Sequence, residues 1–272
     1  MKYKIILASS ILAVAILFVA IINRKADTAA MFDAGILYPV EGRKAVLVEL
    51  FTSQGCSSCP PADRLLSELD QSQPVTGAEV IALSEHVDYW NRLGWTDPFS
   101  SSAFSQRQSL YSRVFDNDSI YTPQMVVDGR EEFVGSNAAR ARNAILEAAR
   151  SDKATITLSA SQASAAIKIR IENLPAVTDG DRAEVVLAIT ESGLQSNVTR
   201  GENSGRRLAH TAVVRSMEVI GSVERGKQFD REAMAQIEKG WNRDQLRAVV
   251  FIQERESRRV LGAATVRMNG KP

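Results

Sequence analysis

The stretch VELFTSQGCSSCPPADRLL at residues 48–66 decides which fold we expect for this chain. Residues 46–51 form a short, almost uninterrupted apolar run, which is typical of a β-strand buried on both faces. Gly55 permits a tight turn after it, and Pro60 and Pro61 suit the first turn of a helix, where a missing N–H is tolerated. Leucines three and four residues apart then mark one face of that helix. The stretch therefore predicts a buried strand, a turn and a helix.

Two cysteines, Cys56 and Cys59, lie in this turn. Free N–H groups at a helix start and the helix dipole favour negative charge, so they lower the pKa of a thiol there from about 8.5 to roughly 3.5–7.5. Two intervening residues let one sulfur attack a partner's disulfide while the other resolves the mixed disulfide. We expect Cys56 to be the more exposed nucleophile and Cys59 to be the resolving residue. The alternative is an inert structural disulfide, which gains little chain entropy because its loop is so small.

The first half of the chain continues with alternating strand and helix patterns. The Asp128-Gly129 dipeptide is a strong hairpin signal between two short strands. A strand, helix, strand order requires parallel strands with a right-handed crossover. We therefore expect an α/β domain at residues 44–150, a mixed sheet flanked by helices. Its further elements are strands at residues 80–83, 124–127 and 132–134 and helices at residues 100–115 and 138–149.

After about residue 151 the apolar residues recur at every second position, as in half-buried strands. Several strands without intervening helices favour an antiparallel sheet or sandwich. We therefore predict a β-rich, sandwich-like second domain at residues 151–272, with one helix at residues 229–239. Its expected strands are residues 155–158, 167–171, 183–190, 211–214, 248–253 and 260–266.

The N-terminus indicates export. Residues 5–22 are apolar apart from two serines, with lysines before them and Arg24 and Lys25 after them. This pattern predicts a signal peptide or signal anchor at residues 1–25, followed by a linker at residues 26–43. A buried core helix is disfavoured by the charged flanks. We expect the chain to be periplasmic or anchored on the outer face of the cytoplasmic membrane, touching the membrane only through this segment.

Composition excludes several classes of function. The chain has 272 residues and a net charge of +1, so no basic field marks it for nucleic-acid binding. Two cysteines do not staple a chain of this length, so the core must come from apolar burial. Nothing implies an organic cofactor, and two histidines leave little material for a metal site.

A second motif, Tyr121-Thr122-Pro123, precedes an expected strand. X-Pro bonds are where cis peptides occur, and a proline ahead of a strand belongs at its first residue. Tyr121, Thr122 and Trp90 are candidates for contacting a peptide substrate. For the tryptophan and its aromatic neighbours, core packing is the alternative interpretation.

These motifs together resemble the thioredoxin superfamily. The full run, which includes SEHVDYWNRLGWTDPF (84–99) and VTRGENSGRRLAH (198–210), resembles a family of exported bacterial thioredoxin-like proteins known as domain of unknown function 1223. The resemblance implies a thioredoxin-like fold in which Pro123 is cis and faces the Cys56–Cys59 pair. It supplies no substrate. The chain differs from thioredoxin in its Ser-Ser pair between the cysteines, in Gly55 before them and in the added β-rich region.

His86 ends the second expected strand, where functional groups of α/β sheets collect. It has three possible roles: a proton acceptor for a thiol, a third ligand beside Cys56 and Cys59 in a Cu(I) site, or a hydrogen-bonded strand-end residue. A zinc site would need His210, which we expect to lie far away. The loop at residues 200–210 is either a solvated hairpin loop or a guanidinium-rich contact for an acidic partner.

The function that these patterns favour is thiol–disulfide exchange, with Cys56 attacking, Cys59 resolving and Pro123 positioning the partner strand. The partners would be exported protein thiols or disulfides. The alternatives are a copper-binding protein and a non-catalytic binding module of the cell envelope. The sequence leaves the client, the direction of electron flow and the oligomeric state open.

Overall fold

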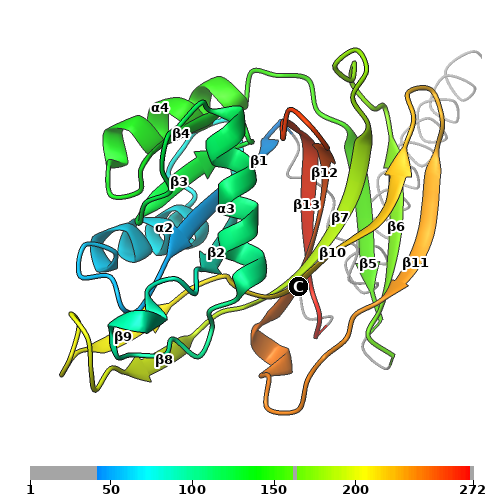
Figure 1. The fold of residues 1–272 in the computed structure, drawn as a ribbon. Helices are drawn as coiled ribbons and strands as arrows, with labels where there is room; N and C mark the ends of the chain where they lie inside the picture. Colours follow the sequence, from blue (N-terminus) through cyan, green and yellow to red (C-terminus); the bar gives the residue numbers. More distant parts are fainter. Residues whose placement is uncertain (1–41, 162–163, 270–272) are drawn as a thin grey trace, which may run out of the picture.

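The computed structural model of the chain describes residues 42–161 and 164–269, and in these ranges strands greatly outnumber helices (Figure 1). The helices are α2 (Pro60–Ser72), α3 (Ser102–Val114) and α4 (Ala138–Ala148), with 3₁₀ turns at Asn91–Leu93 and Arg243–Gln245. The strands are β1 (Lys44–Thr52), β2 (Ala78–His86), β3 (Gln124–Val127), β4 (Glu131–Val134), β5 (Thr155–Ala160), β6 (Ala166–Glu172), β7 (Ala183–Glu191), β8 (Leu194–Asn197), β9 (Arg207–His210), β10 (Val213–Val223), β11 (Phe229–Met234), β12 (Leu246–Glu254) and β13 (Val260–Arg267).

One mixed sheet runs through both halves of the chain. Its strand order is β13-β12-β7-β10-β2-β1-β3-β4. β1 and β2 are parallel, as expected, but the outer edge of β2 pairs with β10, where Val213 lies opposite Ser84. The prediction of a thioredoxin-like α/β domain followed by a separate sandwich-like domain is therefore wrong. An uncovered edge of β2 would present unpaired N–H and C=O groups, and β10 covers that edge with strands from the second half.

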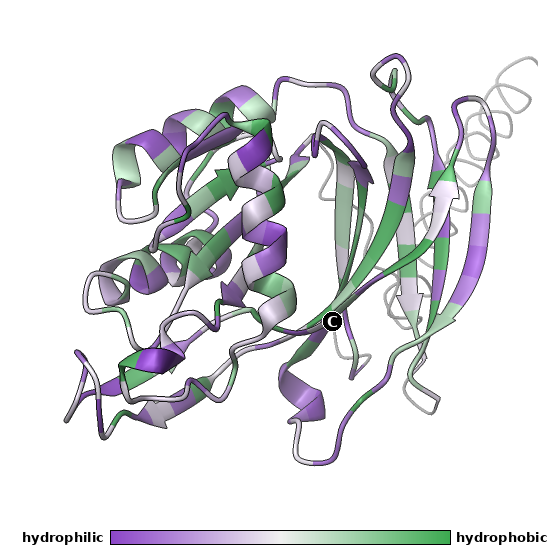
Figure 2. Ribbon diagram, viewed as in Figure 1, coloured by the Kyte–Doolittle hydropathy of each residue, from purple (hydrophilic) through white to green (hydrophobic). Residues whose placement is uncertain are grey.

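Helices and a second sheet cover the two faces of this large sheet. On one face, α2 and α4 pack over β1, β2 and β3, and the three-stranded sheet β11-β6-β5 packs over β7 and β12. On the other face, α3 packs against a core that draws on β1, β2, β7, β10, β12 and β13. The sheet curls around this second core, because β13 contacts β1 although the two are not neighbours in the strand order. Figure 2 shows that the central strands are mostly hydrophobic.

The hairpin expected at Asp128-Gly129 is confirmed, and it joins β3 to β4. Both residues have a positive φ, 48° for Asp128 and 63° for Gly129, as a two-residue hairpin turn requires. A Cβ at Gly129 would lie 1.9 Å from the carbonyl oxygen of Arg258. Only glycine therefore fits here, and this close approach fixes the β12–β13 turn against the β3–β4 turn.

Most of the other expected elements are confirmed, but the helix predicted at residues 229–239 is wrong. Residues Phe229–Met234 form β11, which pairs antiparallel with β6. Phe229, Arg231 and Ala233 lie opposite three isoleucines of β6, so strand pairing overrides the local helical pattern.

The N-terminal predictions lie almost wholly outside the described residues. The signal or anchor at residues 1–25 is entirely outside them, and of the linker at residues 26–43 only residues 42 and 43 are described. Within residues 42–161 and 164–269, no helix has the length and apolar character needed to cross a bilayer.

Candidate functional site

The cysteine turn connects β1 to α2. Cys56 and Cys59 form a disulfide, and their Cα atoms are 5.4 Å apart. Cys59 immediately precedes α2, whose first two residues are prolines, as predicted. Ser57 and Ser58 between the cysteines are exposed to solvent. The disulfide therefore lies at the start of a helix, bridged by two accessible serines.

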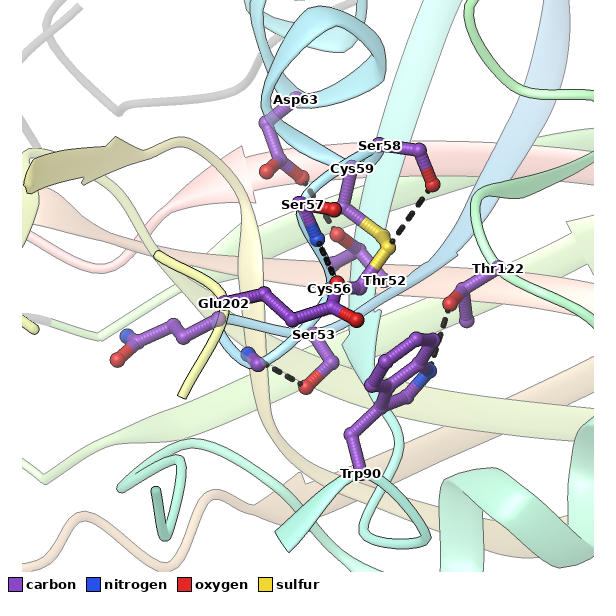
Figure 3. Close-up of a disulfide and its surroundings, with 12 residues drawn as sticks. Thr52, Ser53, Cys56, Ser57, Ser58, Cys59, Asp63, Trp90, Thr122 and Glu202 are labelled. Atoms are coloured by element: carbon purple, nitrogen blue, oxygen red, sulfur yellow. Dashed lines mark hydrogen bonds between the residues drawn. A yellow bond between two sulfur atoms is a disulfide. The ribbon is translucent and has the colours of Figure 1, made fainter. Parts of the chain in front are cut away.

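Neither cysteine is accessible in this conformation, since both have a relative exposure of 0%. The prediction that Cys56 is the more exposed of the two is therefore wrong. Trp90 and Thr122 lie on one side of the disulfide, and Glu202 lies on the other (Figure 3). Exchange requires a thiolate to reach a sulfur atom directly. A partner therefore reaches this disulfide only after some covering group moves.

A loop from the second half of the chain covers one side of the cysteine turn. We call residues 198–206, between β8 and β9, the covering loop. Its residue Asn203 has a relative exposure of 0% and donates from Nδ2 to the carbonyl oxygens of Gln54 and Cys56, both at 2.9 Å. These bonds tie the covering loop to the backbone of the turn, where the Cys56 carbonyl also accepts from the Cys59 N–H at 3.2 Å.

The covering loop also contacts the exposed part of the turn. The carboxylate of Glu202 accepts a hydrogen bond of 2.9 Å from the backbone N–H of Ser57 (Figure 3). Hydrogen bonds from the Ser57 hydroxyl and N–H lower the pKa of Glu202. The sequence predicted either a solvated hairpin loop or an arginine site here. The structure places a hairpin here whose inner side is bonded to the cysteine turn.

Gln54 joins the cysteine turn to both halves of the chain. Its backbone N–H donates to Asp97 Oδ2 at 2.8 Å, and its Oε1 accepts from Trp95 Nε1 at 3.0 Å. Its Nε2 lies 2.8 Å from Ser196 Oγ and 3.1 Å from His210 Nε2. The backbone before Cys56 is therefore held on several sides.

His86 and His210 lie side by side near the cysteine turn. Their ring centroids are 4.9 Å apart, so the expectation that His210 lies far away is wrong. His86 Nδ1 is 2.7 Å from Asp97 Oδ2. Burial opposes the charged form of His86, but the Asp97 carboxylate outweighs it and raises the pKa of His86. Burial and the neighbouring His86 lower the pKa of His210 to about 3. The Asp97 carboxylate therefore favours the protonated form of His86, and burial favours the neutral form of His210.

This geometry matches the hydrogen-bonded role among the three considered for His86. No set of three or more His, Cys, Asp or Glu side chains in residues 42–161 and 164–269 is arranged to hold a metal ion. The copper alternative with Cys56, Cys59 and His86 stays a prediction that no contact of these residues favours, since Asp97 engages His86 and the two sulfurs bond each other.

A carboxylate that the sequence analysis did not single out, Asp63, lies one helical turn beyond Cys59 (Figure 3). Its backbone N–H donates to the Cys59 carbonyl at 3.1 Å, and its Oδ1 accepts from the Thr52 hydroxyl at 2.8 Å. Burial raises the pKa of Asp63 to about 6, against the opposing effects of His86 and Thr52. A carboxyl group with this pKa is able to accept and return a proton near neutral pH.

Replacing Asp63 by asparagine is expected to slow closure of the Cys56–Cys59 disulfide from the reduced protein about tenfold at pH 7, because a nearby proton acceptor is lost. The wild-type rate should rise through pH 6, and the variant should lack this step. Because burial raises the pKa of Asp63, the folded state binds its proton more tightly than the unfolded state does. Ionisation of Asp63 above pH 6 therefore lowers the stability of the folded state. The variant should therefore be at least as stable as the wild type at pH 8.

The rate of disulfide closure is measured by stopped-flow oxidation of the reduced chain at pH values on both sides of 6. Stability is measured by thermal unfolding at pH 8. Glu68→Gln, on the exposed side of α2, is the matched control and should match the wild type. An unchanged pH profile in the Asp63→Asn variant would remove Asp63 from the proton path.

The start of α2 offers few free N–H groups to a thiolate. Its first two residues are prolines without N–H groups, and the N–H groups of Ala62 and Asp63 both donate to the Cys59 carbonyl, at 2.9 and 3.1 Å. The stabilisation expected from free helix N–H groups is therefore weaker than the sequence suggested. The hydroxyl of Ser58, 3.3 Å from the Cys56 sulfur, is the donor placed to stabilise a thiolate.

A Ser58→Ala variant is therefore expected to attack a small aromatic disulfide about fivefold more slowly than the wild type. This corresponds to the loss of about 1 kcal/mol of hydrogen bonding to the attacking sulfur. The measurement is the absorbance of the released thiolate after full reduction of the protein. Ser72→Ala, at the exposed end of the same helix, should react as the wild type does, and equal rates for both variants would contradict this role.

Of the three candidates for substrate contact, two lie beside the cysteine turn. Trp90 Nε1 donates to Thr122 Oγ1 at 2.8 Å, and Trp90 Cβ lies 3.2 Å from where a Cβ would stand at Gly55. The hydroxyl of Tyr121 bonds instead to Glu132 on β4. Trp90 and Thr122 are thus adjacent to the cysteine turn, whereas the hydroxyl of Tyr121 points to β4.

Pro123 is buried at the start of β3, and the Thr122–Pro123 bond is cis. Its carbonyl accepts from the Gly135 N–H at 2.9 Å. A Cβ at Gly135 would lie 3.3 Å from Pro123 Cβ and 3.2 Å from Ala62 Cβ, so Pro123 lies near the first turn of α2. The catalytic role assigned to it remains a prediction.

Residues 47–253 match the model of a family described as a protein of unknown function, DUF1223. The chain belongs to this family. No curated protein matches it significantly.

Two solved structures share the fold. Protein AGR_C_4864 from Agrobacterium tumefaciens is 24% identical, with a TM-score of 0.66, and the match covers 85% of this chain and 97% of that one. HBP35 of Porphyromonas gingivalis is 14% identical, with a TM-score of 0.62, and the match covers 85% of this chain and 77% of that one. At these identities the matches show similarity of fold alone.

Sequence reasoning did not single out Asp63, Gln54, Asp97 and Asn203 as parts of the site. Asp63 follows Cys59 by four residues, a spacing that places both on one face of a helix, so this signal was available. Asn203 and His210 come from a distant segment, and no local pattern places them beside the cysteines.

Proposed function

We propose that this DUF1223 protein exchanges disulfides with exported protein thiols through Cys56 and Cys59. The observation that carries the proposal is the Cys56–Cys59 disulfide in a turn between a buried strand and a helix, bridged by two exposed serines. A purely structural disulfide of this kind closes a loop too small to add much stability. A reactive role explains the pair better.

The proposed chemistry has two balanced steps. In the reduced protein the Cys56 thiolate attacks a client disulfide, forming a mixed disulfide and releasing one client thiolate. The Cys59 thiol then gives its proton to the Asp63 carboxylate and attacks Cys56, which restores the internal disulfide and releases the second client thiolate. The client gains two electrons and the protein loses two. The reverse sequence, starting from the oxidised form described above, would oxidise a client dithiol.

Related expectations belong to the same proposal. Kinship with the thioredoxin superfamily draws on the sequence pattern of the cysteine motif and the later Thr-Pro motif, and it concerns these local motifs rather than the whole fold. Export to the periplasm, or anchoring on the outer face of the membrane, draws on the apolar run at residues 5–22. Under this proposal, Trp90, Thr122 and Pro123 contact the client beside the cysteines.

The test compares Cys59→Ser with Cys56→Ser in the full chain, using insulin as a client with disulfides. The wild-type protein should accelerate insulin reduction by dithiothreitol. Cys59→Ser should accumulate a mixed disulfide with an insulin chain, because Cys56 attacks and nothing resolves it, whereas Cys56→Ser should form far less. Failure of the wild-type protein to exceed dithiothreitol alone, or equal trapping by both variants, would end the proposal.

A further inference from the structure

A cavity of about 540 Å³ lies between α3 and the strands β7 and β10, away from the cysteine turn. Its outer wall includes exposed apolar side chains, since Leu110 on α3 and Val219 on β10 are 39% and 57% exposed. Further inside, Phe104, Val186 and Val214 belong to the core beneath α3 and also line it. The cavity thus leads from an apolar rim into the concave side of the sheet, with a volume typical of small-molecule sites.

An arginine without an ionic partner lines this cavity. Arg258, in the β12–β13 turn, has a relative exposure of 8%, and its Nε is buried without a hydrogen-bond partner. Among the described residues it forms no ion pair within 4 Å, although the charges of Glu49 and Glu85 favour its charged form, and the Tyr111 ring lies 5.6 Å away. Burying a guanidinium without an acceptor is costly. Proteins therefore seldom leave such a group unmatched.

The two buried carboxylates near Arg258 have a different arginine as their direct partner. Arg107 also lines the cavity, and it is bonded to Glu49 at 2.6 Å and lies 3.5 Å from Glu85. Burial, and then the charge of Glu49, raise the pKa of Glu85 well above its usual range, while Arg107 and Arg258 oppose this rise. Glu49 and Glu85 thus contact Arg107 directly, whereas Arg258 interacts with them only at longer range.

A second donor lies near the other end of β12. Trp241 lines the cavity, and its indole nitrogen is buried without a hydrogen-bond partner. Three acidic residues also line the cavity: Glu218 and Glu238 are exposed, and Glu184 is half-buried and lies 3.9 Å from Arg255. The cavity thus has N–H donors without a partner, and both apolar and acidic side chains at its rim.

We propose that this cavity binds an amphipathic carboxylate, whose carboxylate group pairs with Arg258 and whose hydrocarbon chain lies along Phe104, Leu110 and Val219. A carboxylate supplies the direct ionic partner that Arg258 lacks, and the apolar walls favour an aliphatic chain over a sugar or nucleotide. The proposal is separate from disulfide exchange, because it uses none of the groups of the cysteine turn.

The test titrates octanoate into the full oxidised chain and follows the heat of binding. One saturable site is expected for octanoate, with 1-octanol and acetate binding at least tenfold more weakly, because each lacks one half of the ligand. Arg258→Met should weaken octanoate binding at least tenfold. Arg150→Met, an exposed arginine paired with Glu147 on the surface, is the matched control and should bind as the wild type does.

A second variant keeps the test decisive if Arg258→Met does not fold. Val219→Asp changes an exposed rim residue and should fold normally, which circular dichroism checks. It should weaken octanoate binding because it places a negative charge beside the hydrocarbon chain. Absence of saturable binding to the wild type would overturn the proposal. Equal affinity for octanol, or wild-type affinity in every folded variant, would also overturn it.

Discussion

An Asn203→Ala variant is expected to lose its Cys56–Cys59 disulfide to dithiothreitol about thirtyfold faster than the wild type. In the wild type, Asn203 donates to the carbonyl oxygens of Gln54 and Cys56 and accepts from Arg206. Each such bond contributes about 1 kcal/mol, so losing two of them from the closed state favours the open loop by about 2 kcal/mol. Because the sulfurs are inaccessible when the loop is closed, the reduction rate should follow the fraction of open molecules.

The rate is read by quenching with a maleimide that shifts the protein on a gel. Ser204→Ala is the matched control within the same loop, because its hydroxyl bonds only to the Thr199 carbonyl. It should react at the wild-type rate. If Asn203→Ala also reacts at that rate while remaining folded, the covering loop does not limit access. The groups that move would then lie on the side of Trp90 and Thr122.

Because the covering loop lies over the cysteine turn, the proposed exchange requires this loop to open. The cysteine turn is built by the first half of the chain, but the loop that closes over it belongs to the second half. A client that displaces Glu202 from the Ser57 N–H would open the site as it binds. Selectivity for such clients would follow, because a small reductant gains nothing from opening the loop and a protein client can replace the lost bonds.

Local patterns in the sequence predicted much of the fold. The apolar run of β1, the prolines at the start of α2 and the Asp128-Gly129 turn each act over a few neighbouring residues, and each is confirmed. The pairing of β10 with β2 depends on residues about 130 positions apart and on one register pair, Val213 with Ser84. No local pattern encodes such a contact, so the two halves were wrongly separated.

In the candidate site, too, local features were predicted and contacts between distant segments were not. The cysteine pair and its helix were predicted, because thiol chemistry and helix starts are local features. The burial of both cysteines was not predicted, because Asn203 and Glu202 reach them from the covering loop. The prolines that mark the helix start also remove N–H donors from it. This consequence could have been predicted from the sequence.

Replacing Arg107 by methionine is expected to lower the free energy of unfolding by about 3–5 kcal/mol, the cost of leaving a buried charge without its partner. Arg107 extends from α3 to Glu49 Oε1 at 2.6 Å, to Gln253 Oε1 at 3.0 Å and to Glu85 Oε1 at 3.5 Å. Its removal leaves the Glu49 carboxylate fully buried, bonded to the Tyr111 hydroxyl and beside the Glu85 carboxyl group. The measurement is urea unfolding followed by circular dichroism at pH 7.

The loss should depend on Glu49. Because Glu49→Gln removes the unpaired charge, Arg107→Met combined with Glu49→Gln should recover about 2 kcal/mol or more. Arg142→Met is the matched control, because its ion pair with Glu68 is half exposed, and it should cost less than about 1 kcal/mol. An equal loss for both arginines would show that the buried charges do not hold α3 to the curled sheet, and apolar packing around Phe104 would then account for that contact.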